Sequence, residues 1–243
     1  MASFRRFALV LALGLPALPT MWAQDSSSSS APAEPSQAQP AQTQGAQSVQ
    51  ARLRARREQR RQQAIRDTYG HLYEAFVGGG YLRFKPGPDL QKVTLYSWDV
   101  ALTRYYNERL GVTVDARGYY GTPFVGLTEY TGLTRPAIST YGFLAGPTYR
   151  LVARPKYSVS ARGLGGVALG NFSGDTNGIT PTTLGLYADS TTYAVSGGVV
   201  GEVNVTPNLS LRLSGDYYGT GFGSQMQNSV GFSYGFVYRF GKQ

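Results

Sequence analysis

The chain has 243 residues, a formal net charge of +9, 42% hydrophobic residues and only 15% charged residues, and it contains no cysteine. This length allows one domain with extensions. The absence of cysteine excludes a disulfide framework, a thiolate metal site and a lipid anchor attached to cysteine. After the N-terminus no segment stays apolar for ~18 residues, so we expect no membrane-spanning helix.

Residues 1–23 have the pattern of an export signal. Arg5 and Arg6 form a basic start, and the apolar stretch "FALVLALGLPALP" that follows is too short to span a membrane. We place the cleavage after Ala23, although Met21 is larger than the small residue usual at that position of the cleavage site. The alternative interpretation, the start of a buried helix, is less favoured because the basic and apolar regions occur in the order of a signal peptide.

Residues 24–49 are dominated by Ser, Gln, Ala and Pro and contain too few apolar side chains to bury a core, so we interpret them as a disordered linker. Residues 50–67 form an arginine-rich arm. It contains two acidic residues and seven arginines, which are Arg52, Arg54, Arg56, Arg57, Arg60, Arg61 and Arg66.

The residue types of this arm favour a partly helical structure. Two interpretations stay open: an arm that contacts the cell wall or anionic lipid through Arg52–Arg66, or a solvated spacer. Export takes the chain away from nucleic acid, so we do not expect nucleic acid as a partner despite the charge.

Residues 71–243 are predicted to form an all-β domain, because period-two alternation of residue types recurs between turn signals. We expect eight strands, at residues 71–84, 91–106, 110–121, 140–151, 157–170, 190–205, 208–219 and 228–240. Their connections alternate between short turns and long loops, the longest being 122–139 and 171–189. This alternation is typical of an antiparallel up-and-down transmembrane barrel in an outer membrane.

The last strand shows which face meets lipid. Its alternate residues are Phe232, Tyr234, Phe236, Tyr238 and Phe240, whereas the residues between them are mostly small. Other strands have one face free of charge and one polar face. Shifting the register by one residue would expose Arg117, Arg162 and Arg212 to hydrocarbon, at about 2–4 kcal/mol each at mid-depth. A soluble lipocalin-type barrel would have the opposite polarity.

Some residues fit this pattern less well. Placing Glu74 inside the barrel also places Phe76 and Leu82 inside. Arg104 is expected outside, near a short turn, where a long side chain can reach lipid headgroups. Pro147 lacks a backbone donor and indicates a bulge or an irregular strand end.

Eight strands enclose a lumen that side chains can fill. The alternation predicts a lumen charge network of Glu74, Asp99, Asp115, Arg117, Arg162, Glu202, Arg212 and Asp216, with Arg150 and Arg239 near the short-turn end. The balance of acids and arginines favours a hydrogen-bonded ionic plug. A narrow or gated ion path through the same residues is the alternative.

No catalytic site is predicted. The only histidine, His71, opens the first strand at the short-turn end, where it would be far from lipid in the outer leaflet. A lipid A acyltransferase or deacylase would need a general base beside a serine. We therefore predict no enzyme activity, no metal site and no cofactor.

Residues 71–240 resemble the outer-membrane-protein-A-like, opacity-type family of eight-stranded bacterial barrels. The resemblance lies in the opening strand "YEAFVGGGYLRF" and the closing stretch "VGFSYGFVYRF", which is similar to the assembly signal of outer-membrane barrels. In this chain "GKQ" follows Phe240, whereas the matching phenylalanine of that signal is usually terminal.

The resemblance implies insertion by the barrel assembly machinery and a role in envelope integrity, adhesion or surface recognition. We therefore expect an outer-membrane barrel surrounded by lipid and lipopolysaccharide, with a structural or surface-interaction function. The two longest loops would meet the outside. A small channel is the first alternative, and an enzyme that modifies lipid A is a weaker one.

Overall fold

The computed structural model describes residues 41–126 and 134–242, which form a long helix and a barrel with its loops. The predicted signal peptide, 1–23, and the linker up to residue 40 lie outside the described residues. Residues 127–133, a part of the predicted loop 122–139, also lie outside them.

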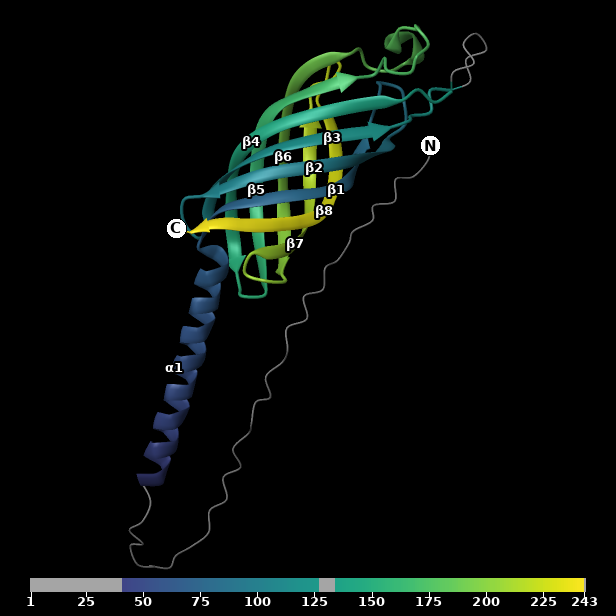
Figure 1. Ribbon diagram of the computed structural model, residues 1–243. Coiled ribbons are helices and arrows are strands. Elements are labelled where there is room, and N and C mark those ends of the chain that lie inside the picture. Colours follow the sequence, from purple (N-terminus) through teal and green to yellow (C-terminus); the bar gives the residue numbers. More distant parts are fainter. Residues whose placement is uncertain (1–40, 127–133, 243) are drawn as a thin grey trace, which may run out of the picture. The chain divides into compact units, whose positions relative to one another are not determined.

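The barrel is a single closed sheet of antiparallel strands, in which each strand pairs with its neighbours in the chain and the first pairs with the last (Figure 1). The strands are β1 (His71–Phe84), β2 (Val93–Tyr105), β3 (Leu110–Gly121), β4 (Ile138–Ala153), β5 (Tyr157–Asn171), β6 (Ser190–Asn204), β7 (Leu209–Thr220) and β8 (Gln227–Lys242). Each predicted strand overlaps one of these. The prediction of an eight-stranded up-and-down barrel is thereby confirmed.

Short turns and long loops lie at opposite ends of the barrel, and we name the ends accordingly. The short turns span 106–109, 154–156 and 205–208. In the first, the Asn107 side chain accepts hydrogen bonds from the backbone N–H groups of Arg109 (2.9 Å) and Leu110 (2.7 Å). Such side-chain bonds explain why asparagine favours tight turns.

The helix α1 (Ala41–Tyr69) precedes the barrel directly. It covers the arginine-rich arm and begins earlier than expected, within the segment interpreted as a disordered linker. Residues 41–69 contain no proline and many Ala, Gln and Arg residues, which propagate a helix well. Gly70 ends it, its N–H donating to the carbonyl of Arg66 (2.8 Å), and β1 follows at once. Among the described residues no helix has both the length and the hydropathy to cross a membrane.

The wall of the barrel is apolar outside and polar inside along most of its length. Val77, Val100, Val114, Val199 and Leu213 are outward-facing and 47–59% exposed. Aromatic side chains lie on the outer face toward both ends of this apolar belt. Toward the long-loop end they include Tyr81, Tyr96, Tyr120, Tyr193 and Tyr217, and toward the short-turn end Tyr106, Tyr149, Tyr157, Tyr238 and Phe240. Apolar belts with aromatic girdles are typical of outer-membrane barrels.

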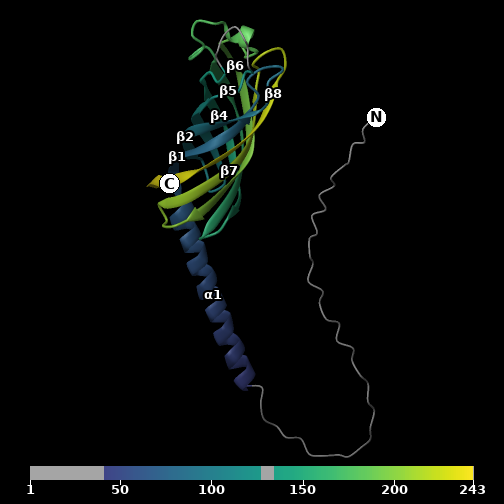
Figure 2. The same ribbon diagram turned by 90° about the vertical axis from the view of Figure 1, so that its right-hand side faces the viewer.

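β8 explains the aromatic alternation of the closing strand. It lies beside β1 where the barrel closes (Figure 2), and its outward rings stack on outward rings of β1. Tyr73 and Phe240 have ring centroids 5.4 Å apart, and Tyr81 and Phe232 are 5.9 Å apart. The small inward residues make room: a Cβ on Gly235 would lie 2.8 Å from the buried ring of Phe76.

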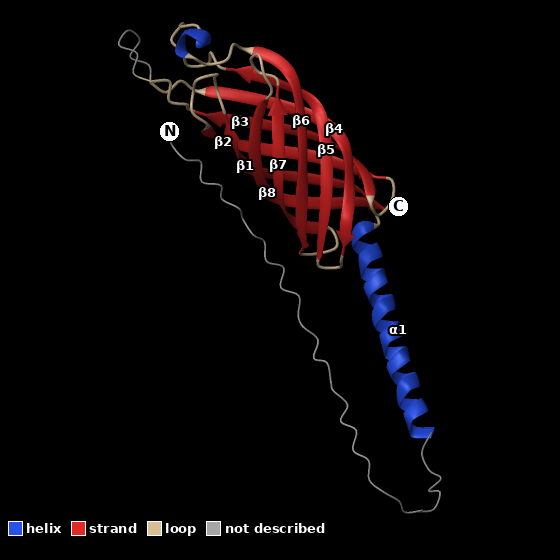
Figure 3. Ribbon diagram, turned by 180° about the vertical axis from the view of Figure 1, so that it is seen from behind, coloured by secondary structure: helices blue, strands red, loops and turns tan. Residues whose placement is uncertain are grey.

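The positions that fitted the alternation less well have clear places in the wall. Phe76 and Leu82 are buried inside, and Arg104 is exposed outside, with its guanidinium 5.6 Å from the ring centroid of Tyr106. Pro147 points outward and pairs with Val112 of β3, but the pairing of β4 with β5 skips Gly146 and Pro147, so the expected irregularity lies on that side of the strand. The register shift of β4 lies further on, between Arg150 and Val152. Figure 3 shows the strands as one continuous wall.

Candidate functional site

The interior of the barrel is the candidate site, because nearly all buried charge of the described residues lies there. All eight side chains of the predicted charge network are at most 6% exposed, as are Arg150 and Arg239. They form two clusters at different depths. We call them the lower cluster, nearer the short turns, and the central cluster.

The lower cluster places two carboxylates among three guanidinium groups. Glu74 accepts hydrogen bonds from Arg150 (2.7 Å), Arg239 (2.8 Å) and Arg212 (3.3 Å). Glu202 accepts from Arg212 (2.6 Å) and from Arg239 (2.6 Å). Because each carboxylate meets at least two guanidinium groups, the cluster is a network of shared charges rather than a set of isolated pairs.

A side chain from the end of α1 covers this cluster. Tyr69 is 1% exposed, and its ring lies 4.4 Å from the guanidinium carbon of Arg150 and 5.2 Å from that of Arg239. Its hydroxyl donates to the carbonyl of Arg154 (2.9 Å) and accepts from the Asn204 amide (2.8 Å). Tyr69 therefore closes the short-turn end of the lumen with both its ring and its hydroxyl.

The central cluster pairs two aspartates with two arginines. Arg162 donates to Asp216 (2.6 Å and 3.0 Å) and to Asp115 (3.4 Å), and Arg117 donates to Asp115. The buried Asp99 is close in the fold, because β2 pairs it with Arg117. Among the described residues Asp99 makes no ion pair, and its Oδ1 has no hydrogen-bond partner.

Neutral polar side chains fill the space between the clusters. The hydroxyl of Thr113 makes hydrogen bonds with those of Thr103 (2.8 Å) and Thr148 (2.6 Å). The cavity that these residues line together with Arg162, Glu202 and Arg212 has a volume of only about 10 Å³. This is about the space of one water molecule.

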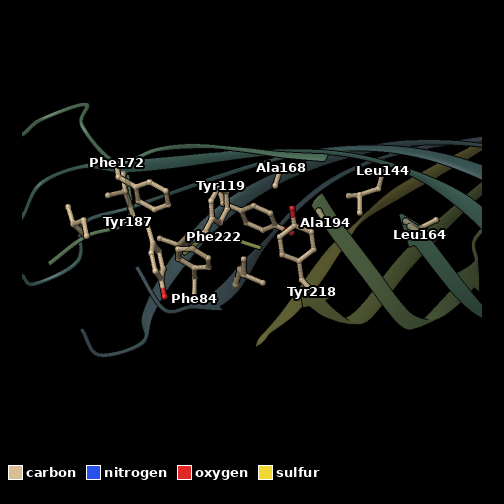
Figure 4. Close-up of a cluster of buried hydrophobic side chains, with 14 of the residues drawn as sticks. Phe84, Tyr119, Leu144, Leu164, Ala168, Phe172, Tyr187, Ala194, Tyr218 and Phe222 are labelled. Carbon is tan, nitrogen blue, oxygen red and sulfur yellow. The ribbon is translucent and has the colours of Figure 1, made fainter. Parts of the chain in front are cut away.

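The long-loop end of the lumen is filled by an apolar cluster (Figure 4). Phe84, Phe172, Tyr187 and Phe222 lie together at its outer side, and Tyr119 and Tyr218 lie deeper. Phe222 packs edge-on against Phe84 (6.2 Å between centroids) and Phe172 (5.4 Å). Phe172, Leu184, Leu186 and Tyr187 come from the loop between β5 and β6, which therefore folds over the mouth of the barrel.

Part of this loop was expected to meet the outside, and the structure corrects that expectation for its apolar residues. The signal was present in "LGLYAD", because three large apolar residues occur within four positions of a polar loop. Sequence reasoning also missed Tyr69, which stands outside every predicted strand. His71 lies at the short-turn end, its Nδ1 3.1 Å from the carbonyl of Thr68.

The other loops leave hollows at the long-loop end. One of about 530 Å³ lies between the β1–β2 and β3–β4 loops and is lined by Leu90, Lys92, Phe124 and Arg135, among others. Its lining combines apolar side chains and two cations with one carboxylate, that of Asp89. Among the described residues no three His, Asp or Glu side chains are arranged to hold a metal ion.

No protein-family model and no curated protein sequence matches the chain. Solved structures with a similar fold include Neisserial surface protein A, 16% identical (69% of this chain, 97% of that chain, TM-score 0.48). The attachment invasion locus protein of Yersinia pestis is 18% identical (69% and 97%, TM-score 0.44), and OprG of Pseudomonas aeruginosa is 12% identical (72% and 99%, TM-score 0.46).

At such low sequence identity, the likeness to these structures concerns the fold alone. The chain's own surface gives the location. Its barrel carries an apolar belt outside and buried charge inside, which is the reverse of a soluble barrel. Closed barrels of this polarity can span membranes, because the strands of the wall satisfy one another's backbone groups without water. The chain therefore forms a closed, membrane-spanning β-barrel.

Proposed function

We propose that the protein is a structural and surface-interaction barrel of the outer membrane whose lumen serves as a plug and not as a pore. The observation that carries this proposal is the continuous filling of the lumen. Tyr69, the lower cluster, the central cluster and the apolar cluster follow one another from the short-turn end to the long-loop end. The plug stiffens the wall and leaves the loops to make contacts.

The contact surface is formed by the loops at the long-loop end, which faces outward if the barrel has the usual orientation. The hollow lined by Lys92, Phe124 and Arg135 offers cations beside apolar side chains. This combination suits lipopolysaccharide or an anionic surface polymer. Insertion would use the barrel assembly machinery, for which the outward aromatics of β8, Phe232 to Phe240, provide the expected signal.

Single-channel recording of the refolded barrel tests the plug directly. We expect no steady openings in planar bilayers, because the lumen narrows to a cavity of about 10 Å³. Steady openings that vanish after Arg117→Ala or Arg162→Ala would overturn the plug and establish the small channel. Both arginines are buried in the central cluster, so an ion path would have to pass them.

The proposal also assigns no enzymatic reaction. The only histidine of the chain, His71, contacts the carbonyl of Thr68 and lies at the end opposite the surface loops. Mass spectrometry of lipid A from cells with and without the protein checks this point. Identical lipid A spectra are expected, and a difference in acylation would contradict the assignment.

The arginine-rich arm gives the barrel a second contact, on the periplasmic side. The arm joins β1 at the short-turn end, which faces the periplasm in the usual orientation. Deleting residues 50–67 should leave barrel folding intact, measured by heat-modifiable gel migration, and weaken the periplasmic association with the cell wall or with inner-leaflet lipid. Unchanged fractionation of the deletion variant would refute this second contact.

A further inference from the structure

The arginines of the arm are spread around about two thirds of the circumference of a regular helix. Its seven arginines and two acidic residues, Glu58 and Asp67, give residues 50–67 a net charge of +5. Between Arg52 and Arg66 the helix rises about 21 Å at 1.5 Å per residue. Its side chains are exposed over most of this length, and the one ion pair formed among them in the described residues joins Arg61 to Glu58 at 3.9 Å.

The arm has no apolar face to lay on a lipid surface. Its two large apolar side chains, Leu53 and Ile65, point about 120° apart around the helix, because twelve residues make about 3.3 turns. Arg57 and Arg61 point in directions between those of the two apolar side chains. A helix that lies in a membrane interface needs a continuous apolar face, and the arm has none.

The base of the arm is fixed to the barrel. The last residue of α1, Tyr69, is held between Arg150 and Arg239 and makes two hydrogen bonds through its hydroxyl. The preceding Thr68 is also buried, and its hydroxyl donates to the carbonyl of Ala64 (2.8 Å). A force on the arm would therefore act on the lower cluster and the wall, not on a flexible joint.

We infer that the arm is a tether that binds a carboxylate-bearing polymer of the periplasm, for which the peptide stems of the cell wall are the fitting chemistry. Guanidinium groups bind carboxylates by paired hydrogen bonds, and arginines spread around most of a helix suit a network polymer that surrounds it. This inference rests on the proposed function in one respect, the placement of the short-turn end in the periplasm.

Co-sedimentation with purified cell-wall sacculi tests the tether, using the mature barrel folded in detergent micelles. The test variant replaces Arg52, Arg54, Arg56, Arg57, Arg60 and Arg61 with glutamine, which keeps the helical propensity. We expect the fraction that sediments at low salt to fall about tenfold or more, because exposed charges act over the screening length of the buffer. A variant with lysine at the same positions keeps the charge but loses the paired hydrogen bonds, so it should sediment less than the wild type and more than the glutamine variant.

Three comparisons decide the outcome. Sacculi whose carboxylates have been converted to neutral amides should no longer retain the wild type. Neutralising Lys85, Lys92 and Arg135 in the loops should change nothing.

If the glutamine variant sediments like the wild type, the arm is not a tether. If binding appears only with vesicles containing an anionic phospholipid, the partner is lipid and the inference is overturned. Failure of the plug would instead appear as conductance, which none of these variants should alter.

Discussion

Glu74 shows why the lumen is a network. One carboxylate, 2% exposed, accepts hydrogen bonds from three guanidinium groups that come from β4, β7 and β8. Removing two ions from water costs several kcal/mol each, and a single ion pair seldom recovers this cost. Sharing each carboxylate among several donors satisfies the guanidinium groups that a narrow lumen isolates from water. The network therefore depends on its acids, which the arginines of the lower cluster outnumber.

Glu74→Gln should lower the free energy of unfolding by about 3–5 kcal/mol, because it leaves three buried guanidinium groups with Glu202 as their only carboxylate in the lower cluster. Urea unfolding in lipid vesicles, followed by gel migration, measures this. Glu108→Gln is the matched control, since that side chain is exposed in a short turn and should change the free energy little. Equal stability of the two variants would show that the network contributes no net stability.

The sequence predicts which charges lie inside but not which of them meet. Strand alternation alone assigns Glu74 and Arg150 to the lumen. Their contact joins residues 76 positions apart across the barrel. That contact depends on the strand tilt and on the curvature of the closed barrel, which bring β1 and β4 to face each other across the lumen. Which side chains meet across the lumen depends on the curvature of the barrel, and the alternation of residues along a single strand does not predict it.

At the scale of elements, the loop between β5 and β6 behaves as part of the core. Its apolar residues pack on Phe84 and Phe222, and an internal 3-10 helix (Pro181–Leu184) shapes the segment that turns back to the barrel. The sequence prediction treated 171–189 as a surface loop because Gly, Thr and Asp dominate it. Composition describes the exposed side of such a loop well, but the few apolar residues that fold inward decide its position.

Phe222→Ala should release this loop from the mouth of the barrel. The change removes a fully buried ring that contacts Phe84 and Phe172, at a cost of about 3–5 kcal/mol. We expect limited proteolysis within 172–189 to become much faster while the barrel stays folded. Phe124→Ala is the control, because Phe124 is 58% exposed in another loop. If both variants resist proteolysis within 172–189 equally well, the apolar cluster does not hold this loop over the mouth of the barrel.

At the scale of the whole molecule, the inside-out polarity fixes the register of every strand. A slip of one residue would move Arg117, Arg162 and Arg212 from the lumen to the lipid and move valines and leucines into the charge network. The sequence was sufficient to predict which face of each strand meets lipid, because the cost of placing a charge in lipid depends on the face that the residue occupies. The loops and the arm carry no such constraint, and there the prediction was less complete.

The lipid-facing belt makes the cost of a charge depend on depth. Leu213→Arg places an arginine on the outer face midway along β7, where Leu213 is 55% exposed and paired with Tyr234. It should cost about 2–4 kcal/mol of unfolding free energy in lipid vesicles. Val205→Arg also introduces an arginine, in a short turn where Val205 is 60% exposed and headgroups are within reach, so about 0–1 kcal/mol is expected. The two side chains are similar in exposure, and their main difference is depth in the belt. Equal costs for the two variants would mean that this surface does not face hydrocarbon, and the outer-membrane assignment would have to be withdrawn.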